Sequence, residues 1–165
     1  MRNLIYILSV FIVLNSCEKE TEIGFETFTL ESEKSSSEPS SNAKISINVP
    51  KATGVELVAN KINTVIFEYV ANINVIDTDS TLNSSIEKAT KNFENEFNSF
   101  RAEFPEEARP WEFFVDGEVS YQSPEIISIA INSYTDTGGA HGNTVIRFFN
   151  FEAHTGKSLY KVDII

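Results

Sequence analysis

The sequence predicts an α+β domain in which an antiparallel β-meander of about three to four strands packs against two helices. Two observations predict this class. Apolar residues recur at helical spacing in two segments between residues 58 and 104, and three segments after Pro110 alternate between apolar and polar residues with the period of a strand. The chain has 165 residues, of which 41% are hydrophobic, so it contains enough apolar material for one packed core.

The chain is acidic, with 13 Lys and Arg against 24 Asp and Glu and a net charge of -11. This charge excludes a Lys/Arg-rich surface that follows phosphates, so we expect no nucleic-acid partner. Cys17 is the single cysteine. It excludes an intrachain disulfide and a cysteine-rich zinc site, and we expect no cofactor and no metal.

The first 16 residues are typical of a signal peptide. Arg2 precedes an uncharged apolar run from Leu4 to Leu14, which is shorter than the roughly 20 residues that span a bilayer. The following Leu14-Asn15-Ser16-Cys17 resembles a bacterial lipobox. The resemblance implies an acylated Cys17 and an exported protein held by membrane lipid in the cell envelope, at the outer membrane or cell surface. The alternative is an ordinary signal peptide that ends in Ser-Cys.

Residues 17–43 are predicted to be the acylated cysteine and a tether rich in Ser and Glu, because such a composition buries too little apolar surface to fold. One partly alternating cluster of apolar residues leaves open a short strand that docks on the domain: Ile23, Phe25, Phe28 and Leu30. The folded domain is predicted to cover residues 44–165.

Within this domain, Lys44 to Val49 alternates and stops at Pro50, which predicts a strand. Val58 to Ile73 has one apolar helical face. A second helix is expected up to Pro105, with Ser80 and Thr81 as candidate N-caps. Its apolar stripe is predicted to be core, with a peptide-binding groove as the alternative: Leu82, Ile86, Ala89, Phe93, Phe97, Phe100 and Phe104.

Strands are then expected over residues 111–121, 126–134 and 145–151. Asp116-Gly117 is either a two-residue hairpin turn or a bulge within one long strand. A glycine-rich turn lies between the last two strands and contains the candidate binding or structural residues, namely Gly138, Gly139, His141, Gly142 and Asn143.

His141 is the candidate in this turn with a functional alternative. It could bind a metal together with Asp136, or move a proton, but two ligands on one loop make a poor metal site. We therefore favour a ring that packs or hydrogen-bonds across the hairpin. The carboxylates near Pro105 could form an acid–base pair, but a solvated helix end is the favoured interpretation: Glu103, Glu106, Glu107 and Glu112. No catalytic residues are expected.

Several short segments together resemble one known family. They are Tyr121-Gln122-Ser123, Ile127-Ser128-Ile129, Tyr134 with Gly138-Gly139-Ala140-His141-Gly142-Asn143, and Asn150-Phe151 with Thr155-Gly156-Lys157. They are similar to the extracytoplasmic domain of unknown function that precedes the catalytic domain of the peptidoglycan deacetylase PdaC. The same domain occurs in the anti-sigma factor RsiV and in stand-alone lipoproteins of the Bacteroidetes type. The resemblance covers roughly Lys44 to the end of the sequence.

The resemblance implies a non-catalytic binding module. In the deacetylase the activity belongs to a separate domain with an Asp and two His metal ligands at helical spacing, whereas this chain has His141 and His154 on either side of a strand. In RsiV the related region binds lysozyme. The implied partners are an envelope glycan or a cationic protein such as lysozyme; the alternative is an accessory or degenerate domain of glycan processing. The companion domain that usually follows in this family is expected to be absent or truncated.

Overall fold

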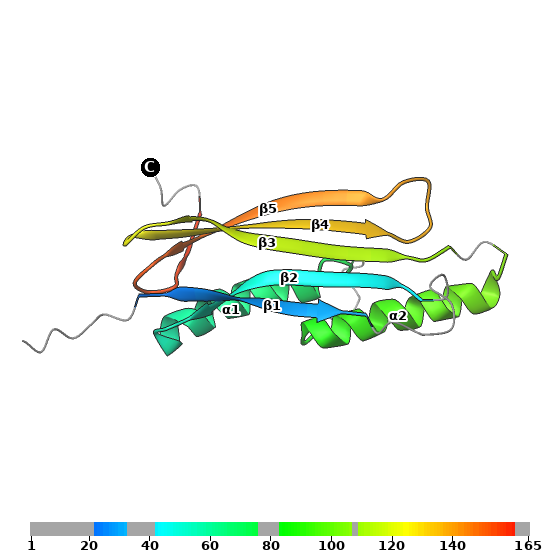
Figure 1. The fold of residues 1–165 in the computed structure, drawn as a ribbon, viewed down its shortest axis with the longest axis horizontal. Coiled ribbons are helices and arrows are strands. Elements are labelled where there is room, and N and C mark those ends of the chain that lie inside the picture. Colours follow the sequence, from blue (N-terminus) through cyan, green and yellow to red (C-terminus); the bar gives the residue numbers. More distant parts are fainter. Residues whose placement is uncertain (1–21, 33–41, 76–82, 107–108, 161–165) are drawn as a thin grey trace, which may run out of the picture.

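The computed structural model describes residues 22–32, 42–75, 83–106 and 109–160. Within these residues, six strands form one sheet in the order β1 to β6, and the two helices lie on one side of it (Figure 1). The elements are β1 Gly24–Glu31, β2 Lys44–Thr53, α1 Glu56–Ala71, α2 Ile86–Glu103, β3 Glu112–Gln122, β4 Ile126–Asp136, β5 Asn143–Glu152 and β6 Ser158–Leu159. The predicted α+β class and the two helices are confirmed.

The predicted meander of three to four strands is wrong in two respects. The described sheet has six strands, and β2 pairs with β3 in parallel while the other neighbours are antiparallel. The parallel pair has a simple cause. The chain leaves β2, passes through both helices and returns beside β2 in the same direction, because a parallel neighbour requires a long crossover connection.

The prediction of a tether from residue 17 to 43 is wrong over residues 24–31. These residues form β1, which pairs with β2 from Gly24↔Thr53 to Glu31↔Ser46. Phe28 and Leu30 pack against the core, and the Phe28 ring lies 5.2 Å from that of Phe67 in α1. The structure confirms the alternative in which this cluster docks as a strand. The signal peptide, Cys17 and residues 33–41 lie outside the described residues.

The core lies between the helices and one face of the sheet. Ile62 and Ile66 of α1 and Phe93 and Phe97 of α2 are buried there, together with alternate residues of β2, β3 and β4. Phe97 is 1% exposed, and its ring lies 5.8 Å from the Trp111 ring. The predicted core role of the α2 stripe is confirmed for these buried residues, whereas Phe104 at its end is 43% exposed.

α2 begins later than expected. Its N-cap is Ser85, whose hydroxyl accepts a hydrogen bond from the Lys88 N–H at 3.2 Å. Asn83, two residues before this cap, donates its side-chain amide to the Ala71 carbonyl at 2.9 Å, so the segment that leads into α2 is bonded to the end of α1. The expected caps Ser80 and Thr81 lie outside the described residues.

Asp116 and Gly117 lie inside the long strand β3, so the hairpin alternative is wrong. A bulge does occur in this strand, but it lies after Gly117, where the register with β4 shifts between Val119 and Tyr121. The bulge reverses the side to which the following residues of β3 point. Tyr121 comes after it, pairs with Ser128 and therefore faces away from the helices.

Candidate functional site

The face of the sheet that points away from the helices is the candidate site. Side chains alternate between the two faces of a strand. Because Phe113, Val115, Ile129, Ile131 and Ser133 are buried towards the helices, their sequence neighbours point to the opposite side. Figure 1 shows both helices on a single side of the sheet. We call this opposite side the outer face.

Four aromatic rings lie on the outer face, and we call them the ring platform: Phe114, Tyr121, Tyr134 and Phe148. Phe114 and Tyr134 are cross-strand partners with stacked rings, 6.2 Å between centroids and 17° between planes. Phe148 is 65% exposed and Tyr121 is 57% exposed. Rings at these exposures offer flat apolar surfaces to solvent and to a ligand.

Polar side chains lie between the rings. The registers place Asn48, Asp116 and Asn132 in one row across β2, β3 and β4. The Asn48 amide is engaged within the sheet, since its oxygen accepts from the Thr29 hydroxyl at 3.0 Å. Asp116 and Asn132 are exposed. The outer face therefore combines apolar ring surfaces with amide and carboxylate groups that can bind hydroxyls.

The length of the platform follows from the register. Tyr134 lies six residues along β4 from Ser128, the partner of Tyr121. At about 3.4 Å per residue this separation is roughly 20 Å. Phe148 lies between these ends, opposite Ala130. A ligand that contacts all the rings must be extended, such as a chain of sugars or a protein surface, and not a single small molecule.

The glycine-rich turn closes one end of the outer face. Arg109 forms an ion pair with Asp136 at 3.3 Å and donates to the Gly139 carbonyl at 2.8 Å. Asp136 also accepts from the Gly138 N–H at 2.8 Å. His141 is exposed, and its Nδ1 lies 3.1 Å from the carbonyl of its neighbour Gly142. Arg109 and Asp136 thus fix this turn, whereas this contact of the His141 ring is with the adjacent residue and does not cross the hairpin.

Gly142 brings the turn against the platform. A Cβ at this position would lie 2.4 Å from the hydroxyl oxygen of Tyr134, while a Cβ at Gly139 would have no atom within 4 Å. We expect Gly142→Ala to displace the turn and to lower the free energy of unfolding by about 1–3 kcal/mol. Gly139→Ala is the matched control and should change it by less than about 0.5 kcal/mol. Urea denaturation of both variants measures the difference; equal midpoints would contradict the contact.

The other candidates are dispersed in the structure. Glu103 and Glu106 are exposed, Glu107 lies outside the described residues, and Glu112 forms an ion pair with Lys44 at 2.9 Å. His141 precedes β5 and His154 follows it. In the part of the chain that the structure describes, no three His, Cys, Asp or Glu side chains gather as metal ligands would. The arrangement of these groups is that of separate surface residues.

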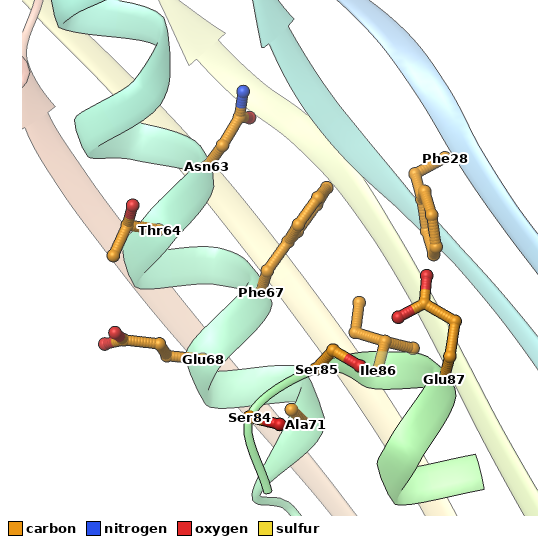
Figure 2. Close-up of a pocket in the computed structure, with 10 residues that line it drawn as sticks. All are labelled: Phe28, Asn63, Thr64, Phe67, Glu68, Ala71, Ser84, Ser85, Ile86 and Glu87. Atoms are coloured by element: carbon orange, nitrogen blue, oxygen red, sulfur yellow. The ribbon is translucent and has the colours of Figure 1, made fainter. Parts of the chain in front are cut away.

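A groove lies on the helix side of the sheet. It has a volume of about 330 Å³ and lies between β1, α1 and the start of α2 (Figure 2). Phe28 and Phe67 point towards each other across it, whereas Glu68 points away. Asn63 in its wall is already bonded to the N–H and carbonyl of Ala52, at 2.7 and 2.9 Å. Ile86 of the predicted apolar stripe lines this groove, whereas no residue of the glycine-rich turn does.

The platform was missed in the sequence, although a sign of it was present. Phe114, Tyr134 and Phe148 occupy the phase of the strand alternation at which a polar residue is expected. Once the residues on the buried side of a strand are known, a large ring on its other side indicates an exposed aromatic surface.

Among the described residues, no helix has the length and apolar character to cross a membrane.

Comparison with known proteins identifies one family. The profile of a family described as Deacetylase PdaC matches residues 36–144. No curated protein matches the sequence significantly.

Two solved structures share the fold. A DUF3298 family protein from Pseudomonas aeruginosa PAO1 superposes with a TM-score of 0.61 at 17% identity, covering 87% of this chain and 58% of that one. A DUF3298 family member from Bacteroides fragilis NCTC 9343 gives 0.63 at 14% identity, covering 87% and 61%. This chain therefore spans about three fifths of the length of these two structures.

Proposed function

This chain belongs to the PdaC family, and on that premise we propose that it is an exported lipoprotein whose domain binds an extended envelope glycan on the outer face of the sheet. The domain acts as a binding module without catalysis. Cys17 carries the lipid, and the peptidoglycan deacetylase that gives the family its name points to sugar chains as the ligand class.

The observation that carries the proposal is the ring platform. Aromatic rings stack on the apolar faces of sugars, and exposed amides and carboxylates bind their hydroxyls. Here the rings extend over roughly 20 Å of one sheet face, at about 3.4 Å per residue. Asp116 and Asn132 lie between the Phe114–Tyr134 pair and Phe148. This spacing favours a glycan of several units over a monosaccharide.

Calorimetric titration with chitooligosaccharides of increasing length tests the proposal. We expect affinity to rise until the oligomer covers the platform. Phe148→Ala should weaken binding about tenfold, because one stacking contact is lost. Phe104→Ala removes a partly exposed ring from the end of α2 and should leave binding unchanged. Equal affinity for all lengths, or release of a cleaved or deacetylated product, would contradict the proposal.

A cationic protein such as lysozyme is the second candidate. The net charge of -11 and the exposed Asp116 and Glu118 on the outer face favour it. Complementary charge raises association rates and specificity, and salt weakens both effects. The same titration with lysozyme separates the two candidates, because glycan binding through rings is insensitive to salt and lysozyme binding falls as ionic strength rises.

A further inference from the structure

Among the residues that the structure describes, β5 has an open edge along most of its length. It pairs with β4 at ten successive positions, from Asn143↔Thr135 to Glu152↔Ile126. On its other side, β6 pairs only with Asn150 and Phe151. Within the described ranges, the segment Thr144–Phe149 has no strand beside it on that side.

The hydrogen-bonding pattern shows which backbone groups point to this edge. In an antiparallel pair, the residues of one strand bond alternately to either side. The Glu152 N–H bonds to the Lys157 carbonyl at 2.9 Å, on the β6 side. Thr144, Ile146 and Phe148 have the same phase as Glu152. Their N–H and carbonyl groups therefore face the open edge and can receive another strand.

The edge lacks the features that usually prevent such pairing. Natural edge strands carry charges, prolines or bulges, or are very short. At the opposite edge of the sheet, β1 carries the exposed residues Glu26 and Glu31. The open segment of β5 has an unbroken register and no proline, and its side chains include Ile146 at 60% exposed and Val145 at 41% exposed.

Arg147 is the one charged side chain of this segment. It lies on the helix side, with its guanidinium carbon 5.0 Å from the centre of the Tyr69 ring and 5.4 Å from that of Phe149. None of the three ion pairs among the described residues includes it. Contact with ring faces positions a guanidinium but uses none of its five N–H donors, which match a carboxylate.

The surrounding sequence also favours an acidic ligand. Residues 137–151 contain no Asp or Glu, although the chain has 24 of them. This stretch is thus a local exception to the acidic charge of the molecule, and Arg147 is its one Lys or Arg. A carboxylate opposite Arg147 therefore meets no like charge within the open segment Thr144–Phe149.

We propose that the open edge of β5 binds an extended antiparallel strand of a partner protein. The strand carries Asp or Glu opposite Arg147 and β-branched residues opposite Val145 and Phe149. Its backbone bonds to Thr144, Ile146 and Phe148, and its carboxylate gives specificity. This edge is distinct from the ring platform, because the platform side chains point out of the plane of the sheet. The proposal for the edge and the proposal for the platform can therefore be tested independently.

A designed peptide tests the proposal with the full-length chain in mild detergent. The probe is acetyl-Val-Thr-Glu-Thr-Val-Thr-amide, whose residues lie opposite Phe149 to Thr144 and stop before Asn150, the partner of Leu159. The control peptide has Lys in place of Glu. We expect the Glu peptide to slow amide hydrogen exchange at Thr144, Ile146 and Phe148, and to bind about tenfold more tightly than the Lys peptide. Absence of peptide binding would overturn the proposal.

Two variants make the test specific. Ile146→Pro removes an N–H that faces the edge and spares the bonds to β4, so it should abolish peptide binding while glycan binding persists. Arg147→Glu should reverse the preference, so that the Lys peptide binds better. A preference for the Glu peptide that survives in Arg147→Glu would contradict the role of Arg147.

The same experiment shows whether the open edge of β5 is filled by a second copy of the chain or by another part of the same chain. Slow exchange at Thr144, Ile146 and Phe148 without peptide means that the edge is already filled. Sedimentation then distinguishes a second copy, which doubles the mass, from pairing within one chain, which does not. Either result would overturn the proposal of a partner strand.

Discussion

Phe97→Ala is expected to lower the free energy of unfolding by about 3–5 kcal/mol, a large part of the roughly 5–15 kcal/mol that a domain of this size has. Phe97 is 1% exposed and lies at the point where α2 meets the sheet. Truncation removes its apolar burial and leaves a cavity beside Trp111, 5.8 Å away between ring centres, which neighbouring side chains fill only in part.

Phe104→Ala provides the matched control for this prediction. It lies on the same apolar stripe of the sequence but is 43% exposed, and its ring contacts only the end of the stripe, 5.2 Å from Phe100. Its replacement should cost about 1 kcal/mol or less. Thermal unfolding followed by circular dichroism measures both. An unchanged midpoint for Phe97→Ala would mean that the helices do not pack on the sheet as described.

Cys17→Ser is expected to abolish membrane association altogether. The proposal makes the acyl chains on Cys17 the anchor, and each buried CH₂ contributes about 0.8 kcal/mol, so losing two or three chains leaves no comparable attraction. Labelling with radioactive palmitate, followed by separation of membrane and soluble fractions, measures the effect.

Asn15→Ser is the control for the anchor. It preserves the Leu-x-Ser-Cys pattern, in which the second position is variable, and should label like the natural chain. Palmitate that still attaches to Cys17→Ser would contradict the lipoprotein proposal while leaving the description of the domain unaffected.

The helices were predictable because their periodicity is local. Ile62, Ile66, Phe93 and Phe97 repeat at helical spacing within short segments, and the structure buries all four. The boundary of α2 was less predictable. Its cap was expected at Ser80 or Thr81, and the presence of several serines before Ile86 gave no reason to prefer Ser85.

The strands were harder to predict because their pairing is not local. β1 is an edge strand with exposed Glu and Thr residues, so its composition resembles that of a linker. Its side toward the core was indicated only by the apolar residues Phe25, Phe28 and Leu30. The parallel pairing of β2 with β3 depends on a connection through both helices, which leaves no mark on either strand's sequence. These two features turned an expected meander into a six-stranded mixed sheet.

The candidate site was identified from the arrangement of the strands in the sheet more than from sequence motifs. The glycine-rich turn was conspicuous in the sequence, and the structure gives Gly142 a packing role beneath the Tyr134 ring. The rings themselves come from three different strands, so the register must be known before they can be seen as one surface. Sequence alternation could identify Phe114, Tyr134 and Phe148 one at a time. It could not identify Tyr121, which faces outward only after the bulge in β3, or the surface that the four rings form together.

The most direct test of the outer face as the ligand surface is residue-specific mapping by NMR during titration of the full-length chain with chitohexaose. The account predicts that chemical shifts change at Tyr121, Asn132 and Phe148, across three strands, and stay constant at Phe67 in the helix-side groove. Changes confined to Phe67 and its neighbours, or no change at saturating sugar, would contradict it.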